Sequence, residues 1–214
     1  MVDWTGPTSD PLGDFNNQVF QMKRKTDFAA LDLPSAEDHA ERLLSALDAW
    51  HEVEENHRTK TPARMVKMLR EMTTREDFEF TTFEAKSQDM ITLGPIPFYS
   101  LCAHHTAPFF GNAYVGYVPE GRIAGLSKFA RTVKERAKGF WVQEELTHDI
   151  ASFLNVHLED PKGVAVVLRA EHLCMAMRGV QQPGVVTTTS AMLGVFGDHT
   201  RTAKAEFMSI IGGK

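Results

Sequence analysis

The order of the predicted elements indicates an α+β protein with a largely antiparallel sheet. Two helix-like segments come first, strand-like segments follow, two more helices interrupt them, and a further pair of strands precedes a last helix. Runs of strands separated by runs of helices are typical of α+β folds, whereas strict alternation of the two predicts a parallel sheet. We find no internal repeat and no low-complexity segment in the sequence.

The N-terminal part predicts an arm followed by helices. Residues 1–34 mix Pro, Gly, Asp and Asn with few periodic apolar positions, which is typical of a flexible arm. From Ser35, a capping candidate, the apolar spacing predicts an amphipathic helix. A second helix is predicted from Thr61, which can cap it, with Pro62 at its first position. We therefore divide the chain into an arm (1–34), a helical region (35–75) and a main domain (76–214).

The remaining elements follow from composition and period. Aromatic and β-branched residues predict strands, and apolar positions three or four residues apart predict helices. The predicted strands are 78–85, 89–101 with a break at Gly94-Pro95, 111–126 with a turn at 119–121, 163–175 and 185–196. The predicted helices are 126–139, 142–154 and 199–211.

Composition limits the possible functions. The chain has 214 residues, 43% of them hydrophobic, which is enough to bury a core in one domain with an appendage. Its net charge of -5 predicts no nucleic-acid partner and no membrane partner, so any phosphate binding must be local. The sequence lacks a signal-like start and an apolar run of roughly 18 residues. We therefore expect a cytoplasmic protein whose two cysteines are thiols or metal ligands.

Both cysteines lie at the ends of strand-like segments, and both have histidines beside them. One segment contains Cys102, His104 and His105, and the other contains His172 and Cys174. Cysteine and neutral histidine are preferred zinc ligands, and a catalytic zinc has three protein ligands. Cys102, His105 and Cys174 could supply them. The alternative, that the cysteines are buried as small hydrophobic residues, stays open from spacing alone.

Polar residues elsewhere could bind an anion or a heterocycle. Ser127 and Lys128 fall at a predicted helix start, where N–H groups favour anions, and Arg131 follows one turn later. On pattern alone, a capping serine and a solvated basic face is the commoner meaning. On pattern alone, the remaining polar candidates are also most simply solvated surface residues. They are Arg64, Lys67, Gln143, Glu144 and Arg178.

Several ordered motifs together carry a resemblance to a known family. They are TPxR, CxHH, GLSKxxR, VQExL, HxC, RG and TTTS, and they run from TPARMVKM to AEFMSII. In these motifs the chain resembles the GTP cyclohydrolase I family. The resemblance implies hydrolytic opening of the guanine imidazole ring of GTP, release of formate and rearrangement to 7,8-dihydroneopterin triphosphate. This reaction would begin tetrahydrofolate, pterin or deazapurine biosynthesis.

The resemblance also implies roles for individual residues. The zinc ligands would be Cys102, His105 and Cys174, with one ion per subunit and another divalent metal left open. The catalytic residues would be His104, His172 and Ser127. Guanine would be recognised by Glu144 with its neighbour Gln143. The triphosphate would be bound by Lys128, Arg131 and Arg178, with Arg64 and Lys67 arriving from a neighbouring subunit.

The implied architecture is the tunnelling fold. In that fold a four-stranded antiparallel sheet carries its helices on one side, here after an N-terminal helical region, and residues 76–214 would form the catalytic domain. Subunits close into a ring barrel, and two rings stack into a homodecamer with active sites between subunits. Ring closure would pair edge strands that one subunit leaves open.

The chain departs from the family pattern at three places. Ala103 stands where the family commonly has Glu, Glu145 where it has Arg, and residues 203–207 where it often has a basic segment. None of these changes removes an expected ligand. They leave open the tuning of the metal site and the downstream pathway.

Two functions from other classes compete with this interpretation. A zinc nucleobase deaminase would need an H-x-E signature together with P-C-x-x-C, and the sequence lacks P-C-x-x-C. A zinc-stabilised, non-catalytic ring protein would not need His104, His172 and Glu144, and all three are retained.

Overall fold

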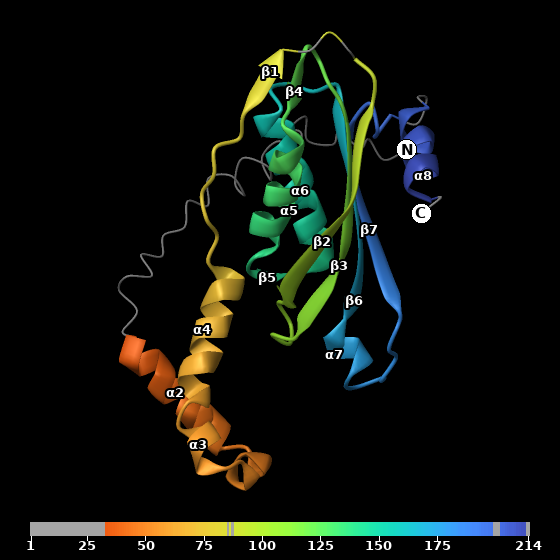
Figure 1. Ribbon diagram of the computed structural model, residues 1–214. Helices are drawn as coiled ribbons and strands as arrows, with labels where there is room; N and C mark the ends of the chain where they lie inside the picture. Colours follow the sequence, from red (N-terminus) through yellow and green to blue (C-terminus); the bar gives the residue numbers. More distant parts are fainter. Residues whose placement is uncertain (1–32, 85, 87, 199–201, 213–214) are drawn as a thin grey trace, which may run out of the picture. The chain divides into compact units, whose positions relative to one another are not determined.

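The computed structural model describes residues 33–84, 86, 88–198 and 202–212 (Figure 1). Contacts between Cα atoms divide the chain into two compact units, one ending at Leu69 and one starting at Arg70. Most of the predicted arm, residues 1–32, lies outside the described residues. Its last two residues, Leu33 and Pro34, already belong to a helix, so the arm as predicted extends too far.

The first unit is helical. Its elements are α2 (Leu33–Ser45), the 3-10 helix η2 (Asp48–Glu52), α3 (Glu55–Arg58) and the start of α4 (Thr61–Thr73). Ser35 lies within α2 and not before it, because the helix begins two residues earlier than predicted. Thr61 is the first residue of α4 and its hydroxyl donates to the carbonyl of His57 at 2.9 Å, which replaces the predicted cap.

The second unit contains the main sheet, with strand order β5-β2-β3-β6-β7. The bounds are β2 (Ile91–Cys102), β3 (Pro108–Val118), β5 (Phe140–Trp141), β6 (Gly163–His172) and β7 (Val186–Gly194). The predicted four antiparallel strands are β2, β3, β6 and β7. A fifth strand was not predicted: β5 pairs in parallel with Leu101 and Cys102, and its two residues are too few to give a period.

Two predicted strands differ in their details. The segment 78–85 contributes only β1 (Thr82–Glu84), which pairs with β4 (Arg122–Ala124) in a separate two-stranded sheet. Gly94 and Pro95 do not break β2, because the register to β3 shifts between Leu93 and Ile96 and the strand continues. The irregularity is a bulge, which bends a strand without ending it.

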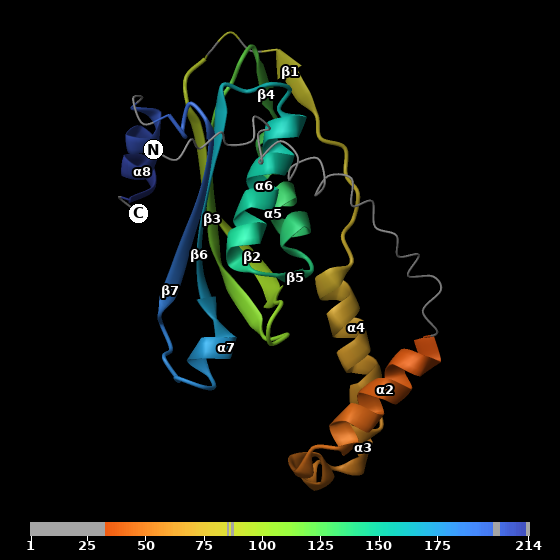
Figure 2. The same cartoon turned by 180° about the vertical axis from the view of Figure 1, so that it is seen from behind.

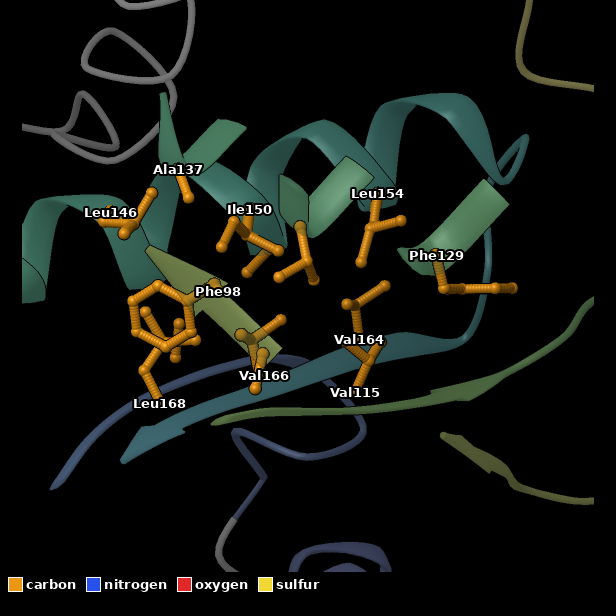
Figure 3. Close-up of a cluster of buried hydrophobic side chains, with 14 of the residues drawn as sticks. Phe98, Val115, Phe129, Ala137, Leu146, Ile150, Leu154, Val164, Val166 and Leu168 are labelled. Atoms are coloured by element: carbon orange, nitrogen blue, oxygen red, sulfur yellow. The ribbon is translucent and has the colours of Figure 1, made fainter. Parts of the chain in front are cut away.

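Helices α5 (Leu126–Ala137) and α6 (Gln143–His157) cover one face of the sheet (Figures 1 and 3). They pack on alternate residues of β6, Val164, Val166 and Leu168, which point toward the helices and are fully buried. Figure 3 shows Ile150 and Leu154 of α6 directed into the same core. The period of two along the strand therefore fixes which β6 side chains face α5 and α6.

The last helix, α8 (Ala203–Gly212), packs on the opposite face of the sheet (Figure 2). This corrects the prediction that all helices lie on one side. Ala165 and Val167 of β6 are fully buried against it together with Phe207. A Cβ atom on Gly116 would lie 2.6 Å from the Phe207 ring, so glycine is what lets this ring lie on the strand. The strand β6 is apolar on both faces, and both faces are covered.

Candidate metal centre and active site

Three potential ligands meet where β2 and β6 end. Cys102 is the last residue of β2, His172 is the last residue of β6, and Cys174 lies in the short helix α7 (Leu173–Ala176). Their ligand atoms all lie within 4.8 Å of one another, and we call these three residues the metal group. The two sulfur atoms are 3.9 Å apart. Two thiolates about 2.3 Å from one tetrahedral zinc would be about 3.8 Å apart, so the spacing fits that ion.

The pKa of Cys174 reflects its burial and the closeness of the two sulfur atoms. Burial raises the pKa of the Cys174 thiol, and the neighbouring Cys102 sulfur raises it further. Arg178 lowers it, which puts that guanidinium within electrostatic range of the metal group. The raised pKa keeps the Cys174 thiol protonated, and a bound metal ion would reverse this because it would be the largest charge in the site. The donor set therefore fits a soft divalent cation such as zinc.

A tight turn brings two more histidines to Cys102. The amide of Thr106 donates to the carbonyl of Cys102 at 2.8 Å, and Thr106 has a φ of 57°. In this turn the Nδ1 atoms of His104 and His105 each lie 3.9 Å from the Cys102 sulfur. A sulfur and a nitrogen on one tetrahedral zinc would be about 3.6 Å apart. The Nδ1 atom of His105 therefore lies close to the distance from Cys102 that a shared ion would require, although the histidine within the metal group is His172.

Two contacts hold the imidazole ring of His172, one on its face and one at its Nε2 atom. Its ring stacks on the buried ring of Phe109, with centroids 4.5 Å apart and planes 1° from parallel. Its Nε2 atom lies 2.8 Å from Oε1 of Gln143. Burial lowers the pKa of His172, and the negative charge of Glu144 partly offsets this. The exposed Glu144 carboxylate is therefore close enough to act on the same imidazole.

Gln143 belongs to a buried polar network that the sequence analysis missed. It is the first residue of α6, and the other members are Thr147 on α6 and Thr189 on β7. The two threonine oxygens are 2.6 Å apart. Only weak signals could have indicated the network: Thr147 is one helical turn after Gln143, and Thr189 belongs to the TTTS motif.

A second group of expected residues lies elsewhere. Ser127, Lys128 and Arg131 are in the first turns of α5, and Ser127 and Arg131 line a polar hollow of about 460 Å³ together with Glu76 and Asp77. The Nζ atom of Lys128 donates to the carbonyl of Glu79 at 2.7 Å. The guanidinium of Arg131 lies 5.6 Å from the centroid of the Phe78 ring.

Within one chain this second group is separated from the metal group. The far end of α5 leads through Gly139 to β5, and Trp141 of β5 pairs with Cys102. Ser127 is ten residues before Ala137, the last residue of α5, which corresponds to about 15 Å along the helix axis. Figure 1 shows the start of α5 beside β4, at the other end of the sheet from α7. The chain by itself does not bring the two groups together.

The last two expected residues lie in the first unit. Arg64 and Lys67 are one turn apart on α4, and both are exposed.

An α+β fold whose sheet ends in a Cys, His, Cys group that could hold a metal ion, next to an exposed carboxylate, has the groups of a metal-dependent hydrolytic site. Comparison with known families identifies which one. The model of the GTP cyclohydrolase I family matches residues 36–212, and the chain belongs to that family.

Individual relatives agree with this assignment. The GTP cyclohydrolase 1 of Hydrogenobaculum sp. is 48% identical over 154 residues, which are 71% of this chain and 84% of that protein. The GTP cyclohydrolase 1 of Thermobifida fusca is 42% identical over 193 residues, 87% of this chain and 91% of that protein. A solved structure of an archaeosine synthase QueF-Like in the apo form has 21% identity and a TM-score of 0.41, and covers 51% of this chain and 97% of that one.

Proposed function

We propose that this protein is a zinc-dependent GTP cyclohydrolase I, which opens the imidazole ring of GTP, releases formate and forms 7,8-dihydroneopterin triphosphate. The observation that carries the proposal is the metal group, which lies beside Glu144, His104 and Arg178 in a chain of this family. Cys102, Cys174 and His105 would hold the ion, which leaves the lone pair of His172 free to accept a proton. Bound there, zinc would supply an activated water for attack on carbon 8 of guanine.

Glu144 is the residue that we assign to guanine. A carboxylate accepts two parallel hydrogen bonds from the N1–H and the 2-amino group of guanine, a pair that adenine does not offer. Glu144 is exposed at the start of α6, so it can reach a ligand, and its charge acts on His172. Guanine bound to it would therefore lie next to the metal group.

The histidines would move protons during ring opening. The pKa of His172 lies below its ordinary value of 6.5, so its imidazole is neutral near pH 7 and can accept a proton. His104 is exposed and places a second imidazole near the metal group, with its Nδ1 atom 3.9 Å from the sulfur of Cys102. Ser127, with Lys128 and Arg131, would act on the ribose and the triphosphate during the later rearrangement. The basic residues would bind the phosphates by charge-assisted hydrogen bonds.

We propose that the active site forms between subunits of a ring. The separation of the α5 group from the metal group means that one GTP needs the start of α5 from a neighbouring chain. Two sheet edges support ring closure: β7 is the last strand, and β2 is covered by β5 only at Leu101 and Cys102. Pairing β2 of one subunit with β7 of the next would close a barrel, and a homodecamer would stack two such tunnelling-fold rings.

The setting of the enzyme follows from the same proposal. Among the described residues, no helix is both long and apolar enough to cross a membrane. We place the protein in the cytoplasm, where GTP is available, and at the first step of tetrahydrofolate, pterin or deazapurine synthesis. Arg64 and Lys67 would reach the triphosphate from a neighbouring subunit.

Incubation of the zinc-loaded protein with GTP tests the proposal. We expect formate and a dihydropterin in equal amounts, the latter detected as a fluorescent pterin after oxidation. ATP should give neither product, because it cannot pair with Glu144. A zinc-loaded protein that binds GTP and releases no formate would be a non-catalytic ring protein. An enzyme that released ammonia instead would be a deaminase.

A further inference from the structure

Gln143 is buried, and all its polar side-chain atoms have partners inside the chain. It is 2% exposed, and its Oε1 atom lies 2.8 Å from Nε2 of His172. Its Nε2 atom lies 3.3 Å from the carbonyl oxygen of Leu168, 3.1 Å from that of Thr187 and 3.1 Å from the hydroxyl of Thr189. These contacts use both N–H donors of the amide and place its oxygen against His172, so neither donor is left for a ligand.

The partners also fix which way the amide points. The carbonyl oxygens of Leu168 and Thr187 can only accept hydrogen bonds, so the amino group of Gln143 must face them. Its Oε1 atom then faces His172. An amide oxygen only accepts, so Nε2 of His172 must donate and must carry the hydrogen.

Two threonine hydroxyls close the network. The hydroxyl of Thr147 donates to the main-chain carbonyl of Gln143 at 2.7 Å, which uses its single hydrogen. Thr189, 2.6 Å away, must therefore donate to Thr147, and its lone pair accepts from the Gln143 amide. Each hydrogen bond in this network therefore has only one possible donor. Reversing the amide would set its oxygen against two carbonyl oxygens and leave buried groups unsatisfied, which is costly.

We propose that Gln143 is a positioning residue, locked by Thr147 and Thr189, that holds His172 in the Nε2–H tautomer and does not bind guanine. This replaces the expectation that Gln143 helps Glu144 to recognise the base. It also gives Thr189 of the TTTS motif a purpose, since its hydroxyl accepts from Gln143.

The tautomer determines what His172 can do. A neutral imidazole has one donor nitrogen and one acceptor nitrogen. With hydrogen on Nε2, the lone pair is on Nδ1, where it can accept a proton or bind a metal ion. The opposite tautomer would lose the hydrogen bond to Gln143 and would have no lone pair at Nδ1. Such a partner behind a functional histidine is a common way to fix its tautomer and ring orientation. The catalytic consequence rests on the proposed function, whereas the tautomer does not.

Paired substitutions at Thr189 test the positioning role. Thr189→Val keeps the shape but removes the hydroxyl, and Thr189→Ser keeps the hydroxyl. We expect Thr189→Val to lower kcat about fivefold, the equivalent of one buried hydrogen bond of about 1 kcal/mol, with KM for GTP unchanged. Thr189→Ser should retain the wild-type kcat. Thr147→Val and Thr147→Ser should reproduce the pattern if Thr189→Val fails to fold.

The opposite results would overturn the proposal. A valine variant with wild-type kcat, or one in which KM rises and kcat stays, would mean that the network does not position His172 or that Gln143 binds substrate. Equal losses in the valine and serine variants would indicate a packing effect only.

Neutron diffraction of the metal-free protein gives a readout that does not depend on activity. We expect a deuteron on Nε2 of His172 and both amide deuterons of Gln143 directed away from it. A deuteron on Nδ1 alone would overturn the inference even in an active enzyme. If the metal-free protein has the deuteron on Nε2 but the zinc-loaded wild-type protein is inactive, the proposed function is refuted and the tautomer is established.

Discussion

Complementation between two inactive variants tests the intersubunit site most sharply. Cys174→Ala removes a ligand from the metal group, and Arg131→Ala removes a cation from the start of α5. The end of α5 nearer the metal group is Ala137, and Arg131 is six residues before it, which corresponds to about 9 Å along the helix axis. If one GTP spans two subunits, each active site takes the metal group from one chain and the α5 group from its neighbour.

The expected recovery follows from counting. In rings assembled at random from equal amounts of both variants, half of the metal groups and half of the α5 groups are intact. About a quarter of the sites then combine two intact halves, so the mixture should regain about a quarter of the wild-type activity. If each site lies within one chain, every chain carries a lesion and no activity returns.

Co-expression of the two variants with different affinity tags gives the mixed assembly for the GTP assay. The matched control pairs Cys174→Ala with Cys102→Ala, whose lesions lie in the same half of the site, and this mixture should stay inactive. Recovery in the control, or none in the test mixture despite proven mixed rings, would refute the intersubunit arrangement.

Three further predictions concern the metal, the last helix and an acidic side chain. Cys174→Ala should reduce bound zinc from about one per subunit to near zero by elemental analysis, whereas His148→Ala, an exposed histidine on α6, should keep the metal; full occupancy in the cysteine variant would show that the ligand set is wrong. Phe207→Ala should lower the free energy of unfolding by about 3 kcal/mol in urea, because the fully buried ring anchors α8, while Met208→Ala next to it, 38% exposed, should cost less than about 0.5 kcal/mol; similar losses at both positions would contradict this packing. At Glu135, burial would raise the pKa, but the hydrogen bond from the Glu76 amide and the Lys138 ammonium outweigh it and lower the pKa below 4.5. That stabilisation is present above pH 4.5 and is lost as the pH falls through the lower folded value, so Glu135→Gln should be less stable than wild type at pH 7 and the difference should shrink at acid pH; a difference that stays constant would mean that the charge of Glu135 does not matter.

The sequence was sufficient for features whose determinants are close together in the chain. Each of the two cysteines has a histidine within three residues, so spacing raised a metal site as one of two alternatives, and the ordered motifs of the family favoured it. The run GVAVVL, residues 163–168, also predicts a second covered face of the strand, which we did not infer from it. Six residues without alternation predict a strand buried on both faces, and α8 covers the second face.

Features made by long-range contacts were not predictable in the same way. Gln143 contacts Leu168 and Thr189, 25 and 46 residues away, so its place in a buried network depends on how α6 packs on the sheet. The proximity of His172 to Cys102 has the same origin, since β2 and β6 end together only through their common neighbour β3. Likewise, the distance of the α5 group from the metal group depends on the direction of α5, which local spacing does not fix.

The most direct test of the account is the stoichiometry of products from GTP. Zinc-loaded protein should release one formate for each 7,8-dihydroneopterin triphosphate formed, and removal of the metal by a chelator should abolish both products until zinc is restored. A fully metallated, assembled protein that binds GTP but yields neither product, or a rate that does not change when the metal is removed, would contradict it.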